Sequence, residues 1–290
     1  MSKYIPDVSS HRWVIVSPHR ISRPGGDGKK PVCPLCMGHE KMTPPEVLRY
    51  GGGAANKPGW QVRVIPNLYP ITDDHEVIVH SPDPDKDIEI LPLPHVKLIF
   101  TAYRQRYNFY KKKGQVIIFC NHGEYAGASL SHPHSQLVVI PSQINLDTLS
   151  QEPLNNMVDA NNFFNVYCPD FSQWPYELWI VPKKPGTVFG DITDEEMADL
   201  AEITQKMLNR MLHIYKEEHV TKMPFSYNYY IYPKENWYFR LIPRFIHRAG
   251  FELGTGLSVN IVDPIDAAME YAGMERKVVH VLKKLKKYNK

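Results

Sequence analysis

Short runs rich in β-branched and aromatic residues recur along the chain, and prolines, glycines and other turn-forming residues separate them. Runs of this kind predict strands, because such side chains fit the pleated surface of a sheet. The seven runs of this type cover residues 12–18, 60–66, 76–82, 115–121, 135–141, 176–182 and 237–243. The sequence therefore predicts a sheet whose strands come from most of the chain.

Longer segments carry apolar residues with helical spacing instead. One begins near Pro94, and another opens at Thr193, which with Glu196 forms the capping-box pattern of a helix start. A third helical segment begins near Asp263 and continues into the tail. This mixture of strands and helices predicts an α+β fold.

Two stretches of the first half have faint counterparts in the second half. The matching pairs are 75–84 with 176–185 and 132–141 with 236–245. Each half also has the order strand, long helix, strand, strand. We therefore predict an internal duplication with units at 1–150 and 170–290, although a coincidence of strand patterns would give the same resemblance.

Composition places the chain among ordinary folded proteins. Hydrophobic residues make up 43% and charged residues 22% of the 290 residues. The net charge of +3 gives no indication of a nucleic-acid partner but suits an anionic small molecule. No stretch approaches the roughly 20 apolar residues of a membrane span, and the first residues lack a signal-peptide pattern. We expect a cytoplasmic protein without a membrane partner.

The segment at 129–141 carries the most specific chemistry. On a strand, alternate side chains share a face, so His132, His134 and Gln136 line one surface. Burying such groups without partners costs about 1–3 kcal/mol each, so the alternation indicates a site, the alternative being an exposed polar edge strand. A neutral imidazole is a nucleophile towards phosphorus, and an amide can donate to phosphate oxygens. His134 is therefore a candidate nucleophile.

Cys33 and Cys36 have the two-residue gap of a metal knuckle or a redox motif. A redox role is the weaker interpretation, because no thioredoxin-like βαβ pattern surrounds the pair. With four cysteines in the whole chain, a disulfide framework is not expected.

The sequence NHGEYAGASLSHPHSQ at 121–136 resembles the active-site segment of the galactose-1-phosphate uridylyltransferase family, within the histidine triad superfamily. Relatives that act on ADP-glucose carry similar segments. Four further motifs resemble family motifs in the same order along the chain: WVIVSPHRISRP, CPLC, PNLYP and GFELGTG. The resemblance implies two histidine-triad-like units, each an antiparallel sheet with helices.

The same resemblance implies a reaction. His134 would attack the α-phosphorus of a nucleotide sugar and hold the nucleotidyl group, and Gln136 would bind that phosphate. A hexose 1-phosphate would then collect the group. The residues that match the family's nucleotide or substrate contacts are Arg20, Arg23, Leu35, Asn67, Asn121, Gly127, Ser129 and Glu252. The base, the sugar and the acceptor stay open, and an ADP-glucose phosphorylase-like enzyme would use inorganic phosphate. Family resemblance also makes a homodimer an expectation.

The resemblance implies one structural zinc ion, with Cys33, Cys36 and His132 among its ligands. Pro84 stands where relatives usually have a further histidine ligand. We expect His80 to replace it; the other possibilities are His39, His75 or no conventional zinc site. A second metal is not expected, because the sequence ENWYFRLIP lacks the histidines of the family's second site.

A hypothesis of another class is a non-catalytic, zinc-dependent nucleotide-binding protein. The altered ligand set and the missing histidines of the second half favour it.

Overall fold

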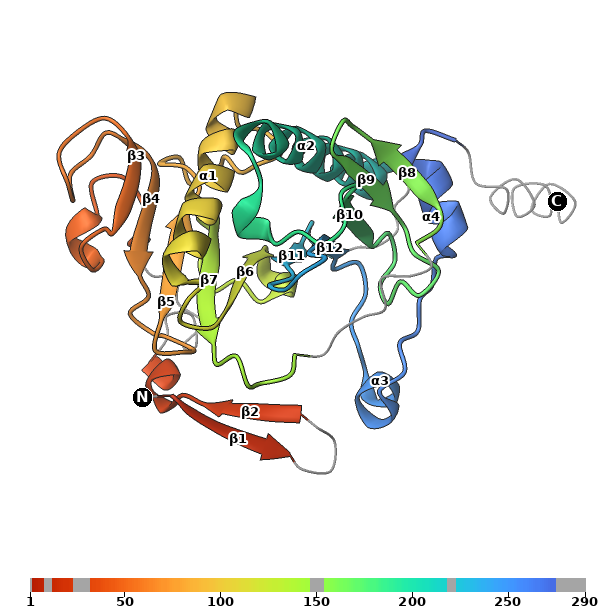
Figure 1. Cartoon of the computed structure of the whole chain (residues 1–290), viewed down its shortest axis with the longest axis horizontal. Coiled ribbons are helices and arrows are strands. Elements are labelled where there is room, and N and C mark those ends of the chain that lie inside the picture. Colours follow the sequence, from red (N-terminus) through yellow and green to blue (C-terminus); the bar gives the residue numbers. More distant parts are fainter. Residues whose placement is uncertain (1, 8–11, 23–31, 147–153, 218–222, 275–290) are drawn as a thin grey trace, which may run out of the picture.

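The computed structural model describes residues 2–7, 12–22, 32–146, 154–217 and 223–274. Strands β1 and β2 form a separate hairpin, and the other ten strands form one sheet (Figure 1). The strands are β1 (Lys3–Asp7), β2 (Arg12–Val16), β3 (Leu48–Gly51), β4 (Trp60–Pro66), β5 (His75–Val79), β6 (Gln115–His122), β7 (His134–Ile140), β8 (Met157–Ala160), β9 (Phe164–Tyr167), β10 (Leu178–Pro182), β11 (Tyr227–Ile231) and β12 (Phe239–Pro243).

The strand order of the large sheet reads the same from both edges. It is β3-β4-β5-β7-β6-β11-β12-β10-β9-β8, with antiparallel neighbours throughout. From one edge the order is first, second, third, fifth and fourth strand of the unit, and the other edge repeats it. The two units meet where β6 pairs with β11. This order is consistent with the predicted duplication, and the α+β class is confirmed.

Two long helices, α1 (Leu93–Tyr110) and α2 (Asp194–Glu217), pack together over one face of the sheet (Figure 1). The Thr193 hydroxyl accepts from the Glu196 backbone, and the Glu196 carboxylate accepts from the Thr193 backbone, so the predicted capping box begins α2. Two short helices follow, α3 (Gly250–Thr255) and α4 (Pro264–Tyr271). None of the described helices has the length and apolar character needed to cross a bilayer.

One core lies between the sheet and the helices, and both units contribute to it. Leu137 and Val139 of β7 pack in this core with Phe100 of α1, as do Leu178 of β10 and Leu200 of α2. Because side chains alternate along a strand, His134 and Gln136 point to the opposite face. That face is where the candidate site lies.

All seven predicted strands are present, with ends that differ by a few residues. Five strands were not predicted: β1, β3, β8, β9 and β11. Because β8 and β9 lie between the predicted units 1–150 and 170–290, this division stays a prediction. The predicted tail helix begins as α4, and residues 275–290 lie outside the described part of the chain.

Candidate active site

His134 begins β7 and is 92% buried, with 8% of its surface exposed. Its Nδ1 lies 2.8 Å from the backbone oxygen of His132, which can only accept, so Nδ1 carries the hydrogen. The lone pair is therefore on Nε2. Burial lowers the pKa of His134 to about 4, and the charges of His80 and His132 act in the same direction. At neutral pH the ring is uncharged, which is the state of a nucleophile.

Gln136, two residues further along the same face, is held by His75 of β5. The backbone N–H of Ile71 donates to Nδ1 of His75 at 2.9 Å, so the His75 hydrogen is on Nε2. This Nε2 donates to Oε1 of Gln136 at 3.0 Å, and Nδ2 of Asn67 lies 3.5 Å from the same oxygen. With its oxygen engaged, Gln136 keeps its amide N–H groups for a ligand.

Both residues line the same solvent-accessible cavity. The predicted site residues that line it are Arg20, Leu35, Asn67, Ser129, His134 and Gln136. The guanidinium of Arg20 is oriented by a 2.8 Å hydrogen bond to the backbone oxygen of Tyr69. Segments far apart in the sequence thus bring a neutral imidazole, a cation and neutral donors to one cavity.

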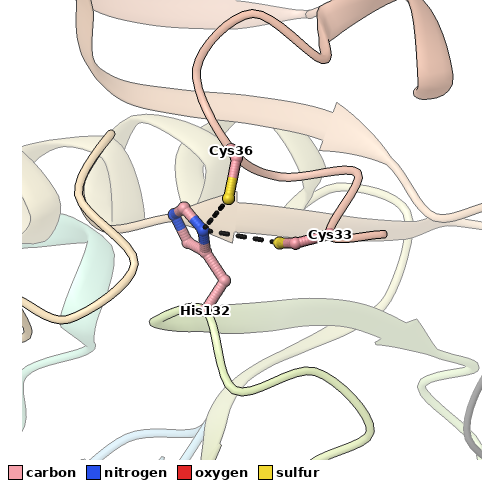
Figure 2. A group of neighbouring side chains, drawn as sticks. All are labelled: Cys33, Cys36 and His132. Carbon is pink, nitrogen blue, oxygen red and sulfur yellow. Dashed lines mark hydrogen bonds between the residues drawn. The ribbon is translucent and has the colours of Figure 1, made fainter. Parts of the chain in front are cut away.

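Cys33, Cys36 and His132 form a group next to this cavity (Figure 2). Nδ1 of His132 lies 3.6 Å from Sγ of Cys33 and 3.5 Å from Sγ of Cys36. Zinc bonds of about 2.3 Å to sulfur and 2.0–2.1 Å to nitrogen place these atoms about 3.6 Å apart in a tetrahedral site. Nε2 of His132 donates to the backbone oxygen of Ser81 at 2.7 Å, which leaves Nδ1 for a metal. The three residues fit zinc.

The thiols of this group differ in acidity. Burial raises the pKa of Cys33, but the contacts with the His132 ring and the Leu35 backbone outweigh burial and lower it to about 7. Burial and the neighbouring Cys33 raise the pKa of Cys36 to about 11. One thiol is therefore close to the thiolate state that binds metal.

Known proteins are similar to this chain in sequence and in fold. The galactose-1-phosphate uridyl transferase N-terminal domain matches residues 69–140. The chain is 27% identical to ADP-glucose phosphorylase of Arabidopsis thaliana over 90% of each chain, and 23% identical to galactose-1-phosphate uridylyltransferase of Haemophilus influenzae over 78% of each. A crystal structure of an Arabidopsis thaliana ADP-glucose phosphorylase with bound ADP-glucose matches with a TM-score of 0.71 and 25% identity, covering 95% of this chain and 100% of that one.

The chain is similar to the galactose-1-phosphate uridylyltransferase family and to its ADP-glucose phosphorylase-like relatives. The resemblance inferred from the sequence motifs is thus confirmed, and nucleotidyl transfer is the chemistry that the relatives have in common.

Not every position that matches a family contact lies at the cavity. Asn121 lines a smaller pocket on another side of His134. Gly127 ends a short 3-10 turn with a φ of 82°, a left-handed conformation that favours glycine. Glu252 caps its own helix α3 through the Ala249 backbone and is not among the residues lining the cavity. Arg23 lies outside the described residues.

His80 is not part of the cysteine–histidine group, which corrects the expectation for the third ligand. Val79 faces the site, so His80 faces the helices. Its Nδ1 lies 2.6 Å from Asp87, and its Nε2 lies 3.0 Å from the hydroxyl of Tyr103 in α1. His39 is outside the group as well, with its Nδ1 2.7 Å from the Cys33 backbone oxygen. Among the described residues, three protein ligands gather here.

In the second unit, different side chains occupy the positions that correspond to His134 and Gln136 on β7. Arg240 makes two hydrogen bonds of 2.6 and 2.8 Å to the Glu177 carboxylate. Tyr238 stacks on Trp179 and on Tyr232. An ion pair and an aromatic cluster therefore fill the surface that corresponds to the His134 site.

No sequence motif indicates a catalytic role for His75, and the sequence predicts an ordinary structural role for His122. His122 borders the small pocket beside His134, and its Nδ1 lies 2.9 Å from Asp87. Burial lowers the pKa of His122, but the hydrogen bond to Asp87 and the charges of Asp87 and Glu89 outweigh burial and raise it. The only signal in the sequence was its place directly after Asn121.

Proposed function

We propose that this chain moves a nucleoside monophosphate from a nucleotide sugar to a hexose 1-phosphate through a covalent intermediate on His134. One observation carries the proposal: a neutral His134, whose Nε2 has no hydrogen, lines the cavity that Gln136 and Arg20 also line. Nucleophile, neutral donor and cation are the groups that nucleotidyl transfer requires.

In the first step Nε2 of His134 attacks the α-phosphorus, and the bond from this phosphorus to the bridging oxygen breaks. The sugar 1-phosphate leaves with the bonding electron pair. No proton has to leave Nε2, and the Nδ1 hydrogen bond to His132 stabilises the positive charge that the ring gains. In the second step a phosphate oxygen of the acceptor attacks the same phosphorus and releases His134.

The neighbouring residues support this route through their positions. The Gln136 amide donates to the non-bridging oxygens as their charge grows, and the Arg20 guanidinium compensates the phosphate charge. Ser129 adds a hydroxyl donor at the same cavity. Leu35 and the apolar wall around it suit the base.

A second candidate differs in acceptor and base. The similarity to ADP-glucose phosphorylase over 90% of both chains favours transfer from ADP-glucose to inorganic phosphate. Purified protein is incubated with UDP-glucose or ADP-glucose, each with galactose 1-phosphate or phosphate. The uridylyltransferase assignment expects product from UDP-glucose and galactose 1-phosphate. Product from ADP-glucose and phosphate alone overturns that assignment and supports the phosphorylase.

Trapping the covalent intermediate distinguishes the two enzyme assignments from the alternative of a non-catalytic nucleotide-binding protein. Nucleotide sugar labelled in the α-phosphate should label the wild type, and His134→Ala should stay unlabelled. Absence of label from both nucleotide sugars contradicts the enzyme assignment.

We propose a structural zinc ion held by Cys33, Cys36 and His132. Bound there, zinc supplies a cross-link between the 33–36 loop and the residues that precede β7. His132 precedes His134 by two residues and its backbone oxygen orients the nucleophile, so this cross-link fixes the position of the His134 ring.

A homodimer is proposed as well. Several apolar side chains of the β1–β2 hairpin and of the α3 region are exposed, among them Val14 at 56% and Leu253 at 78%. Light scattering coupled to size exclusion should give twice the 33.5 kDa of one chain. A mass of one chain at micromolar concentration rejects the dimer.

A further inference from the structure

Two arginines of the second unit share one aromatic ring. The guanidinium carbons of Arg244 and Arg248 lie 4.5 and 4.6 Å from the ring centre of Trp174. Among the described residues neither forms an ion pair with a carboxylate. Arg248 instead donates to the neutral side chains of Gln173 and Ser258 at 2.9 and 3.0 Å. The charge of Arg248 helps to lower the pKa of Glu252, so a carboxylate lies near Arg248, whereas no carboxylate acts on Arg244 among the described residues.

A row of side chains connects this pair to the nucleophile. Asn121 follows Cys120, which pairs with Ser135 next to His134, and Asn121 itself pairs with Asn228 of β11. Nδ2 of Asn228 donates to Oδ1 of Asn121 at 2.8 Å. Oδ1 of Asn228 accepts from Nη1 of Arg244 at 3.1 Å. Paired side chains share a face of the sheet, so this row runs along the face that carries His134.

The segment after β12 also touches the glycine-containing loop of the site. The rings of His247 and Tyr125 lie 5.2 Å apart, and Tyr125 belongs to the 3-10 turn of residues 124–126. The segment that carries Arg244, His247 and Arg248 therefore lies beside the loop that precedes His134.

Arg244 keeps hydrogen-bonding capacity that the described residues do not use. Its Nε is buried and has no hydrogen-bond partner among the described residues. Burial and the charge of Arg248 both lower the pKa of Arg244, so an anion placed there removes an unfavourable interaction. The planar guanidinium matches the geometry of a phosphoryl group.

We propose that Arg244, supported by Arg248, binds the phosphoryl group that is exchanged at His134. This inference rests on the proposed function. In a two-step transfer at one site, the leaving and the entering phosphoryl groups occupy the same position. Arg244 would therefore contact the β-phosphoryl group of the nucleotide sugar and then the phosphoryl group of the acceptor, whether inorganic phosphate or hexose 1-phosphate. Trp174 is the positioning residue that holds the two guanidinium groups.

Calorimetry with nucleotides of different length tests this assignment. UMP and AMP carry only the α-phosphate, whereas UDP and ADP add the β-phosphate. We expect Arg244→Ala to weaken binding of the diphosphate by about 10- to 100-fold and to leave binding of the monophosphate within about twofold. Arg244→Lys should recover part of the lost affinity, because lysine keeps the positive charge but lacks the planar set of N–H donors of the guanidinium. Arg248→Ala should weaken diphosphate binding less.

The control is Arg104→Ala, which removes an arginine of α1 on the other face of the sheet and should change neither affinity. Unchanged monophosphate binding also reports that Arg244→Ala is folded. Steady-state assays with phosphate and with hexose 1-phosphate then show for which acceptor the variant raises KM. An unchanged ratio of diphosphate to monophosphate affinity, or an equal loss for both, overturns this inference alone. A wild type that binds none of the nucleotides overturns the proposed function together with it.

Discussion

Nε2 of His75 donates its hydrogen to Oε1 of Gln136 at 3.0 Å, across the pairing of β5 with β7. This contact decides which end of the Gln136 amide faces the cavity. Without it the amide can rotate and present its oxygen to the phosphate, which would repel the oxygens that it should bind.

We therefore expect His75→Leu to slow formation of the nucleotidyl-enzyme by about 10-fold or more, since removing one donor to a developing oxyanion costs about 10²–10³ in rate. Rapid-quench measurement with the active nucleotide sugar gives this rate. The matched control is His213→Leu on α2, whose side chain is exposed and which should keep the wild-type rate. A His75→Leu variant that is folded and reacts at the wild-type rate contradicts the orienting role.

The zinc content of variants distinguishes the proposed ligands Cys33, Cys36 and His132 from nearby histidines that do not bind the metal. Cys36→Ser and His132→Ala should each lose most of the bound zinc and lower the thermal midpoint, because each removes one of three protein ligands. His39→Gln should keep its zinc, since His39 is engaged with the Cys33 backbone. Elemental analysis of the purified proteins measures the stoichiometry. Equal zinc loss in His39→Gln would place that residue in the ligand set.

The contact between His122 and Asp87 predicts a pH dependence of stability. The pKa of His122 is raised, so the stabilisation that the charged ring contributes is complete below its usual value of 6.5 and is lost as pH rises through the raised pKa. The groups that face the ring are Asp87, Glu89 and Tyr227.

Thermal midpoints of the wild type and of His122→Gln should differ most near pH 6, and the difference should shrink towards pH 9. Asp87 has the opposite sign, because its lowered pKa, for which His80 and His122 are responsible, supports stability until the pH falls below about 4. A difference that grows with pH would show that His122 is neutral in the folded protein.

The buried pair of Arg240 and Glu177 predicts a large effect on stability in the second unit. Arg240→Met leaves the Glu177 carboxylate buried without its cation, which costs about 3–5 kcal/mol. The double variant with Glu177→Gln should recover much of this loss, because the amide oxygen still accepts from Trp179. Urea unfolding measures both. Equal stability of the single and double variants contradicts a buried charge at Glu177.

The strands with strong β-branched runs can be predicted from the sequence, and alternation along a strand predicts which face His132, His134 and Gln136 share. Strand β11 cannot be predicted in this way, because its sequence YNYYI has no clear alternation and its position depends on pairing with β6 and β12. The same holds for β8, a short edge strand with an irregular register near Asp159. Long-range pairing, which has no local signature, forms these strands.

The third zinc ligand shows the limit of spacing arguments. His80 is close to Pro84 in the sequence, but the alternation along β5 turns its ring towards Tyr103 and away from the cysteines. The same alternation rule that puts His134 and Gln136 on one face would have excluded His80. The contact between His75 and Gln136 depends on the register of β5 against β7, which the sequence does not specify.

Strands β6 and β11 pair along their length, so each half of the large sheet covers an edge strand of the other half. Without β11, strand β6 would be an edge strand with unpaired N–H and C=O groups, which favours self-association. The second half therefore protects the half that carries His134 from aggregation, independently of any chemistry on its own surface.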